Sequence, residues 1–293
     1  MSFFAETLIS GLFAGVMYAL VAIGFVLIYK ASGVFNFAQG AMLLFSALLF
    51  VTLIEHETPF ILAFGLTSLA MIAMAFIIER LVLRPLRNRD SLTLFMATLG
   101  LSYVIEGLAQ LLMGTDVHML DLGIPDIAVD VGGISVSQFD IVASLIGLLL
   151  VAILSAVFSK TRMGIALRAV ADDTLAAQSI GIRLPVIWRI VWSVAGIVAL
   201  VAGLLWGARQ GVQYSLSLIT LKALPVLIIG GFSSIPGAIV GGLLVGATEA
   251  LADTYIGPLL NGSVSTWFAY ILAVGFLLVR PAGLWGDREI ERV

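Results

Sequence analysis

Long apolar stretches with almost no charged residue dominate this chain. Seven stretches contain no Asp, Glu, Lys or Arg, namely 7–29, 31–54, 58–78, 141–159, 190–208, 223–248 and 254–279. An eighth, 91–114, carries one carboxylate at Glu106. A helix needs about 20 apolar residues to cross a hydrocarbon core. The pattern therefore predicts an all-α protein, a polytopic transmembrane helical bundle of about eight membrane segments.

Two of these stretches contain residues that interrupt a helix. The sequence GGFSSIPG at 230–237 divides 223–248, and the polar segment 30–40 begins another stretch. Irregular backbone at membrane depth is tolerated only where protein or a water-filled cavity surrounds it. We therefore expect one or two broken or re-entrant helices. For 223–248 the favoured form is two half-helices that enter and return, and the alternative is a kinked full span. For 30–40 the alternatives are a tight turn before a capped helix and a part of a transport pathway.

Glycine pairs four residues apart recur within the predicted spans. Examples are Gly11 with Gly15 and Gly242 with Gly246. Small residues at this spacing let two membrane helices approach closely. They predict tight packing, and they are too common in membrane helices to indicate a function.

Composition and charge exclude several classes of protein. Hydrophobic residues make up 61% of the 293 residues and charged residues 11%, whereas soluble domains average about 45–50% and 25%. The formal net charge of −3 offers no basic excess for nucleic acid, so we expect no nucleic-acid partner. The absence of cysteine excludes disulfides and zinc–thiolate sites.

The distribution of basic residues predicts an orientation, because Lys and Arg prefer the cytoplasmic ends of spans. An extracytoplasmic N-terminus places 13 of the 15 basic residues inside and only Arg209 and Lys222 outside. The loop 115–140, which has five aspartates and no Lys or Arg, is then extracytoplasmic, and the loop 160–189 is cytoplasmic. If every stretch crosses the membrane in turn, the arginines near the C-terminus end outside. They end inside if 223–248 does not cross.

Sequence motifs for enzymatic chemistry are absent. There is no G-x-x-x-x-G-K-[ST] phosphate loop for ATP, and the two histidines, His56 and His118, lack metal-ligand spacing. We expect no catalytic residues, no metal and no cofactor. Glu106 is the clearest ionisable residue within a span, and Glu249 lies near the end of another. Each is either a buried hydrogen-bonding residue or part of a transport pathway.

The cytoplasmic loop contains a segment, 166–180, that is rich in Ala, Leu, Arg and Asp and has no helix breaker. It predicts one short amphipathic helix that ends at Gly181. The predicted apolar face holds Ala169, Leu175, Ala176 and Ile180, and the predicted wet residues are Arg168, Asp172 and Asp173. Such a helix either rests on lipid or docks a soluble partner.

Four segments in order resemble one known family over nearly the whole chain. They are GLFAGVMYALVAIGFVLIYKASGVFNFAQGAM (11–42), ERLVLRPLRNR (79–89), MGIALRAVADDTLAAQSIGI (163–182) and LIIGGFSSIPGAIVGGLLVGATEAL (227–251). The sequence resembles permease subunits of the branched-chain amino acid ABC transporters, a hydrophobic amino acid uptake group that also includes urea and short-chain amide importers. It most resembles the shorter of the two paralogous permeases.

The resemblance implies a single permease domain over 1–293 in a bacterial inner membrane. The implied partners are a second paralogous permease, two ATPase subunits, an extracytoplasmic substrate-binding protein and the lipid bilayer. It also implies that the cytoplasmic loop couples the permease to the ATPase. The matching positions are Arg168, Ala169, Asp172, Asp173, Ala176, Ala177 and Gly181. A stand-alone secondary transporter or channel is the alternative from another class.

The assignment of a translocation pathway is our own inference from the residues. A charged amino acid needs polar groups or exposed backbone in a low-dielectric slab. The candidates are Asn36, Gln39, Glu106, Gly231, Ser233, Ser234 and Pro236. Gln39 stands where many relatives have His, which weakens a protonation role at that position.

Overall fold

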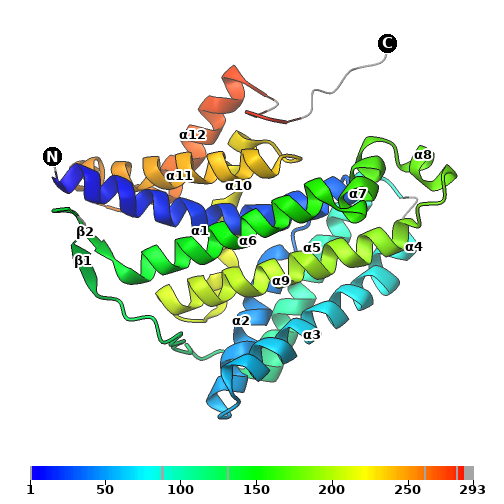
Figure 1. The fold of residues 1–293 in the computed structure, drawn as a ribbon, viewed down its shortest axis with the longest axis horizontal. Coiled ribbons are helices and arrows are strands. Elements are labelled where there is room, and N and C mark those ends of the chain that lie inside the picture. Colours follow the sequence, from blue (N-terminus) through cyan, green and yellow to red (C-terminus); the bar gives the residue numbers. More distant parts are fainter. Residues whose placement is uncertain (1, 87–88, 131, 261, 282, 287–293) are drawn as a thin grey trace. The chain divides into compact units, whose positions relative to one another are not determined.

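A computed structural model describes residues 2–86, 89–130, 132–260, 262–281 and 283–286 (Figure 1). The chain groups into two compact units. Unit 1 comprises Met1–Val26, Gly123–Val151 and Thr220–Val293, and unit 2 comprises Leu27–Leu122 and Ala152–Ile219. The single permease domain expected over 1–293 stays a prediction.

Helices make up most of both units. Unit 2 contains α2 (Gln39–Glu55), α3 (Phe60–Ile78), the π-helix η1 (Glu79–Leu83), α4 (Arg84–Leu86), α5 (Ser91–Met113), α7 (Arg162–Asp172), α8 (Thr174–Ser179), α9 (Leu184–Gln210) and the 3₁₀ helix η2 (Tyr214–Leu218). Unit 1 contains β1 (Ala128–Asp130), β2 (Ser135–Ser137), nearly all of α10 (Ile219–Gly230), α11 (Ile235–Tyr255), the 3₁₀ helix η3 (Gly257–Leu260) and α12 (Ser265–Val279). The division between the units falls within α1 (Ser2–Ser32) and α6 (Gln138–Lys160).

The helices have the length and composition that the hydrophobic pattern predicts. Six of the described helices are long and apolar enough to cross a membrane, and three shorter apolar segments cover Gln39–Glu55, Tyr214–Gly230 and Trp267–Val279. This confirms the predicted polytopic helical bundle. The predicted extracytoplasmic loop adds only a two-stranded antiparallel ribbon, in which Val129 pairs with Val136.

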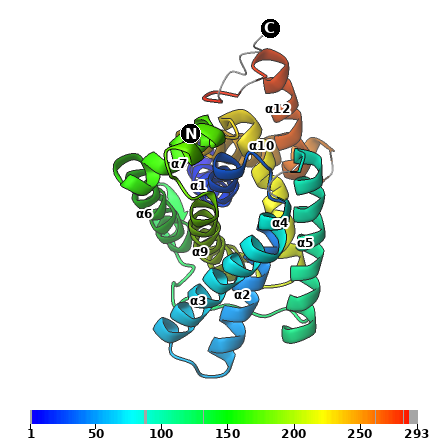
Figure 2. The same ribbon diagram turned by 90° about the vertical axis from the view of Figure 1, so that its right-hand side faces the viewer.

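Helix α2 forms the centre of unit 2. It packs against α3, α5 and α9, and Figure 2 shows α2 and α3 as neighbours joined by a short turn. The side chains of Phe50 on α2 and Trp192 on α9 are fully buried. By contrast α3 leaves large apolar side chains exposed, among them Ile61 at 86% and Leu69 at 63%. In a membrane protein an exposed apolar face of this kind suits contact with lipid.

In unit 1 the predicted glycine pairs bring α1 and α11 into close contact. Gly11 lies against Gly246, and Gly15 lies against Gly242. Because the contacts run in opposite order along the two helices, α1 and α11 are antiparallel. A Cβ added at Gly15 would lie 2.5 Å from the carbonyl oxygen of Gly242. The Gly-x-x-x-Gly spacing therefore makes this backbone approach possible.

The stretch 223–248 is a helical hairpin rather than one span. Helix α10 ends at Gly230, helix α11 begins at Ile235, and the helices pack together so that Gly230 faces Gly237 and Val226 faces Gly241. A kinked full span is therefore excluded. The prediction of two half-helices is wrong for α11. This helix extends to Tyr255, and its 21 residues suffice to cross a bilayer.

Side-chain caps define where several helices begin. Asp90 precedes α5, and its carboxylate accepts hydrogen bonds from the hydroxyl and the backbone N–H of Thr93 at 2.6 and 3.3 Å. The hydrogen bond from the Thr93 hydroxyl holds the pKa of Asp90 below its ordinary value. Thr161 caps α7 in the same way through the N–H of Gly164.

Candidate functional site

The first predicted interruption is real and lies between α1 and α2. The chain leaves helical geometry after Ser32 and resumes it at Gln39. The side chain of Asn36 is fully buried, and its Oδ1 accepts a hydrogen bond from the N–H of Ala38 at 3.0 Å. Asn36 thus stabilises the turn before α2, as the tight-turn alternative expects, but α2 begins at Gln39 without the side-chain cap that this alternative also predicted.

Gln39 differs from Asn36 because it points to another helix. Its side chain is fully buried, and its Nε2 donates to the carbonyl oxygen of Ala195 on α9 at 3.4 Å. Its Oε1 has no hydrogen-bond partner among the described residues. An unsatisfied buried amide oxygen is costly, and such groups mark positions that merit a functional test.

The same turn is attached to α5 through backbone and aromatic contacts. The Thr98 hydroxyl accepts a hydrogen bond from the N–H of Phe37 at 3.3 Å and lies 3.2 Å from the carbonyl oxygen of Phe35. The rings of Phe35 and Phe37 pack edge-to-face, and Phe37 packs in the same way on Phe95. Sequence reasoning missed Thr98, since an isolated threonine in an apolar helix gives no signal.

Glu106 lies on α5 and belongs to unit 2, which also contains Asn36 and Gln39. Its Oε2 accepts a hydrogen bond from the hydroxyl of Tyr214 at 3.2 Å. Glu106 is only half-buried, so it is a hydrogen-bonded residue near η2. Its place in a transport pathway stays a prediction.

The other pathway candidates lie at the hairpin turn in unit 1. Gly231 has φ of 100°, which glycine adopts readily and other residues rarely do. Its N–H donates to the carbonyl oxygen of Leu227 at 2.8 Å. Ser234 caps α11 by accepting from the N–H of Gly237 at 3.0 Å, and Pro236 occupies the first turn. Ser233 is half-buried in this turn.

The chain's own C-terminal segment covers this turn. The N–H of Leu284 donates to the carbonyl oxygen of Ile229 at 2.8 Å, and the N–H of Trp285 donates to that of Gly230 at 3.2 Å. A Cβ added at Gly231 would lie 2.6 Å from the backbone nitrogen of Gly286. The space beside Gly231 is therefore filled by backbone, and an open passage is absent at that point of the described chain.

A buried charged cluster, which sequence reasoning missed, joins three helices of unit 1. Lys222 on α10 donates to Glu249 Oε1 on α11 at 2.6 Å, and the hydroxyl of Tyr18 on α1 lies 3.2 Å from the same oxygen. The side chains of Lys222 and Glu249 are 28% and 8% exposed. Lys222 lies in the first turn of α10, and its predicted place on the extracytoplasmic side stays a prediction. The 27-residue separation gives no helical spacing signal, so only the hairpin brings the pair together.

The loop 160–189, which is predicted to be cytoplasmic, forms two helices instead of the one predicted. Helix α7 ends at Asp172 and α8 begins at Thr174, because Asp173 leaves helical geometry at φ −154° and ψ 105°. The Asp173 carboxylate then accepts from the N–H groups of Leu175 and Ala176, each at 2.9 Å. Asp is a strong N-cap former, so the residue expected on a wet helical face starts a second helix. Gly181 follows α8 with φ of 94°, as predicted for the end of the segment.

The predicted apolar face does not lie on one helix, because Ala169 belongs to α7, whereas Leu175, Ala176 and Ile180 lie on α8 or directly after it. The buried residues of α7 and α8 are Gly164, Leu167, Val170 and Ala177. Leu175 and Ile180 are instead each 77% exposed, and Ala176 is exposed as well. The loop therefore presents an apolar surface, which we define as Leu175, Ala176 and Ile180. Ala169 is half-buried and Asp172 is exposed.

Arg168 holds the loop against the end of α6. Its guanidinium donates to the carbonyl oxygens of Phe158 and Ser159 at 3.1 and 3.4 Å. These carbonyls belong to the last turn of α6, where backbone acceptors lack helical partners. Arg168 therefore acts as a cap that positions α7.

Comparison with known proteins gives matches over nearly the whole chain. The family described as "Branched-chain amino acid transport system / permease component" matches residues 7–280. The high-affinity branched-chain amino acid transport system permease protein LivH of Salmonella typhimurium is 30% identical, over 99% of this chain and 98% of that protein. BraD of Pseudomonas aeruginosa, with the same description, is 29% identical over 99% and 98%. The probable LivH of Methanocaldococcus jannaschii is 29% identical over 92% and 89%.

These matches cover nearly all of the helices described above. The match to the family includes the first interruption, the cytoplasmic loop and the α10–α11 hairpin. This multi-pass membrane protein belongs to the family of permease components of branched-chain amino acid transport systems.

Proposed function

We propose that this chain is the permease subunit of a bacterial ABC importer that moves branched-chain amino acids across the inner membrane. Separate ATPase subunits hydrolyse the ATP, a second paralogous permease completes the membrane part, and an extracytoplasmic binding protein delivers the substrate. The near-complete match to the branched-chain amino acid permeases carries this proposal.

The exposed apolar surface of the cytoplasmic loop supports a soluble partner. Leu175 and Ile180 expose apolar side chains next to polar and charged residues, and exposed apolar surface of this kind indicates an interaction site. An ATPase that covers Leu175, Ala176 and Ile180 is the proposed occupant. Arg168 and Asp173 are then positioning residues, because their side chains bond within the loop and its neighbouring helix end.

For the pathway we propose Gln39 as the first polar group to test. Its buried Oε1 without a partner can accept a hydrogen bond from a passing solute. Glu106, Asn36, Ser233, Ser234, Pro236 and Gly231 remain proposed pathway positions. The capping roles of Asn36 and Ser234 favour support of the backbone over direct contact with substrate.

An uptake experiment tests the transport function. The gene is deleted and restored in its own cell, and uptake of labelled leucine, isoleucine and valine is compared with uptake of urea and a short-chain amide. We expect deletion to abolish the saturable uptake of the branched-chain amino acids and restoration to recover it. If only urea or amide uptake falls, the assigned substrate class is wrong, and uptake that persists without the ATPase genes argues for a stand-alone transporter.

A single substitution tests the docking surface. Ala176→Asp places a charge on an exposed residue, so the isolated chain should fold, whereas a contact that buries the carboxylate without a partner becomes costly. We expect at least a tenfold loss of ATPase co-purification and of uptake, with unchanged amounts of the chain in the membrane. Ala176→Ser is the matched control, because it stays small and uncharged. Normal assembly and uptake by Ala176→Asp would remove this surface from the docking site.

A further inference from the structure

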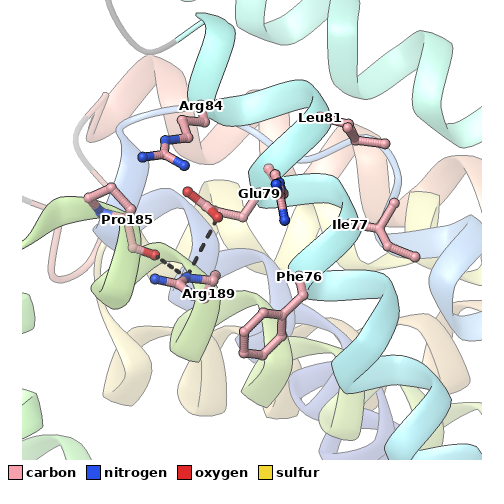
Figure 3. Close-up of a pocket in the computed structure, with 8 residues that line it drawn as sticks. Phe76, Ile77, Glu79, Leu81, Arg84, Pro185 and Arg189 are labelled. Atoms are coloured by element: carbon pink, nitrogen blue, oxygen red, sulfur yellow. Dashed lines mark hydrogen bonds and ion pairs between the residues drawn. The ribbon is translucent and has the colours of Figure 1, made fainter.

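A cavity of about 510 Å³ lies where α3 and η1 meet the first turns of α9. Figure 3 shows Glu79, Arg84 and Arg189 directed toward the same space. The complete lining consists of Phe76, Ile77, Glu79, Arg80, Leu81, Arg84, Pro185 and Arg189. All of these residues belong to unit 2.

One of the three arginines is already engaged. The Nε of Arg189 donates to the carbonyl oxygen of Pro185 at 3.1 Å and lies 3.6 Å from Glu79 Oε2. Its guanidinium carbon also lies 5.2 Å from the centre of the Phe76 ring. Arg189 thus balances the charge of Glu79 and closes one side of the cavity.

The other two arginines are available to a ligand. Arg80 and Arg84 are exposed, and neither side chain makes a hydrogen bond or ion pair with any residue in the described ranges. The second carboxylate oxygen of Glu79, Oε1, is buried and has no partner among those residues either. The cavity therefore offers two guanidinium groups that have no partner among the described residues.

The local backbone explains how these residues gather. Pro85 has no N–H to donate to the carbonyl oxygen four residues earlier, so the regular helical ladder cannot continue. Instead the N–H of Arg84 donates to the carbonyl oxygen of Glu79, which gives the π-helix η1. The wider turn keeps Glu79, Arg80 and Arg84 beside one another, and π-helical turns are frequent at functional sites.

The charged residues that line the cavity begin where the apolar run of α3 ends. The 19 residues of α3 rise about 28 Å, which matches the roughly 30 Å of a hydrocarbon core. The residue after the helix is Glu79, and Arg80 follows at once. The apolar side chains beside the cavity remain exposed, with Ile77 at 56% and Leu81 at 68%. The arginine cluster at 80–89 assigns this end to the cytoplasmic side.

We propose that this cavity binds the headgroup of an anionic phospholipid. The phosphodiester pairs with Arg80 and Arg84, because guanidinium groups match phosphate oxygens in charge and geometry. Free inorganic phosphate shares the phosphate chemistry, but the exposed Ile77 and Leu81 provide apolar contact that only acyl chains use.

The test measures lipid bound to the full chain, purified with its accompanying subunits and placed in phosphatidylcholine nanodiscs with graded amounts of phosphatidylglycerol. Native mass spectrometry counts the phosphatidylglycerol retained per chain. Arg80→Gln with Arg84→Gln should weaken retention about 30-fold, since each arginine near a membrane surface contributes roughly fivefold. Arg80→Gln and Arg84→Gln are also measured singly, each with an expected loss of roughly fivefold. Arg89→Gln is the matched control for these single variants, because it removes one charge from the same cluster but does not line the cavity.

Three outcomes would overturn the proposal. Equal retention by the double variant and the wild type would remove the arginines from the site. A roughly fivefold loss in Arg89→Gln, equal to that of either single cavity variant, would show that only the summed charge of the cluster matters. Displacement of the lipid by excess inorganic phosphate would assign the cavity to a free anion, and gel filtration of each variant confirms that the chain remains folded.

Discussion

Among the described residues, buried and half-buried polar side chains bond in two different ways. Asn36 and Ser234 bond to backbone within four residues of themselves, so their partners are local and their role is to shape a turn. Gln39 and Glu249 find their partners on other helices. Residues of the second kind depend on tertiary packing, and the loss of one partner leaves a buried group unsatisfied.

The variant Gln39→Leu distinguishes a role of Gln39 in transport from a role in the stability of the fold. The change removes one hydrogen bond and also an unsatisfied oxygen, so we expect the free energy of unfolding to change by no more than about 1 kcal/mol. Uptake should fall at least tenfold if Gln39 lines the pathway. Ser46→Ala is the control, because this buried hydroxyl bonds within α2 to the carbonyl oxygen of Leu43 and its loss should spare uptake. Full uptake by Gln39→Leu would exclude the residue from the pathway.

We expect Gly231→Ala to lower the stability of the folded chain, and not only to reduce transport. A side chain at positive φ costs roughly 1–2 kcal/mol, and at Gly231 it also meets the backbone of Gly286. Gly181→Ala is a close control, with φ of 94° and no atom within 4 Å of the added Cβ. We expect the Gly231 variant to show the lower melting temperature in detergent. Equal melting temperatures would mean that the C-terminal segment moves away from the added side chain without a loss of stability.

At the scale of elements, the α10–α11 hairpin is the main feature that the hydrophobic pattern could not predict. The breaking residues of 230–237 mark where the helix stops, but they do not say whether the chain bends or reverses. Close contacts between Gly230 and Gly237 and between Val226 and Gly241 decide for reversal. The same reversal brings Lys222 to Glu249.

The Lys222–Glu249 pair should show strong coupling in a double-mutant cycle. Lys222→Met or Glu249→Gln alone leaves one charged partner partly buried, which costs on the order of 2–4 kcal/mol. The two changes together should cost less than their sum by about 1–3 kcal/mol. A cycle of Lys222→Met with Thr248→Ala is the control, because Thr248 bonds within α11 to the carbonyl oxygen of Leu244. Additive costs at Lys222 and Glu249 would contradict an ion pair that holds the hairpin together.

The whole chain follows a simple alternation once the hairpin is counted as two segments. The six long apolar helices and three shorter segments make nine crossings if each one spans. From an extracytoplasmic N-terminus, nine crossings end inside, where the arginines at 280, 288 and 292 belong by the positive-inside rule. Arg288 and Arg292 lie outside the described residues. The conflict that eight segments created near the C-terminus then disappears.

Single-cysteine labelling tests this topology without background, because the chain contains no cysteine. An impermeant maleimide added to intact spheroplasts should label Ser137→Cys and Leu259→Cys but not Ser159→Cys or Ser233→Cys. Inverted vesicles should show the opposite pattern. Labelling of Ser233→Cys from outside would show that α10 does not cross, and labelling of Ser159→Cys from outside would reverse the whole orientation.

Much of the candidate site could be anticipated from residue type and spacing. Proline and paired glycines stop helices through backbone geometry, so the interruption near Gly231 is visible in the sequence. The interruption near Asn36 is marked instead by the polar residues of 30–40. The cytoplasmic loop was recognisable from its polar composition. The break at Asp173 was not, because Asp is tolerated within a helix and becomes a cap only where the following N–H groups are free.

The sequence by itself determined the class of protein and, apart from the α10–α11 hairpin, the positions of its long apolar segments, because hydrocarbon requires about 20 apolar residues in each helix. Its glycine spacing also determined which helical faces permit close approach. Only the tertiary structure decided which partners meet across helices, as with Lys222 and Glu249 or Arg189 and Glu79. The physical reason is that such pairs depend on the direction and packing of whole helices, and separations of 27 and 110 residues carry no periodic signal.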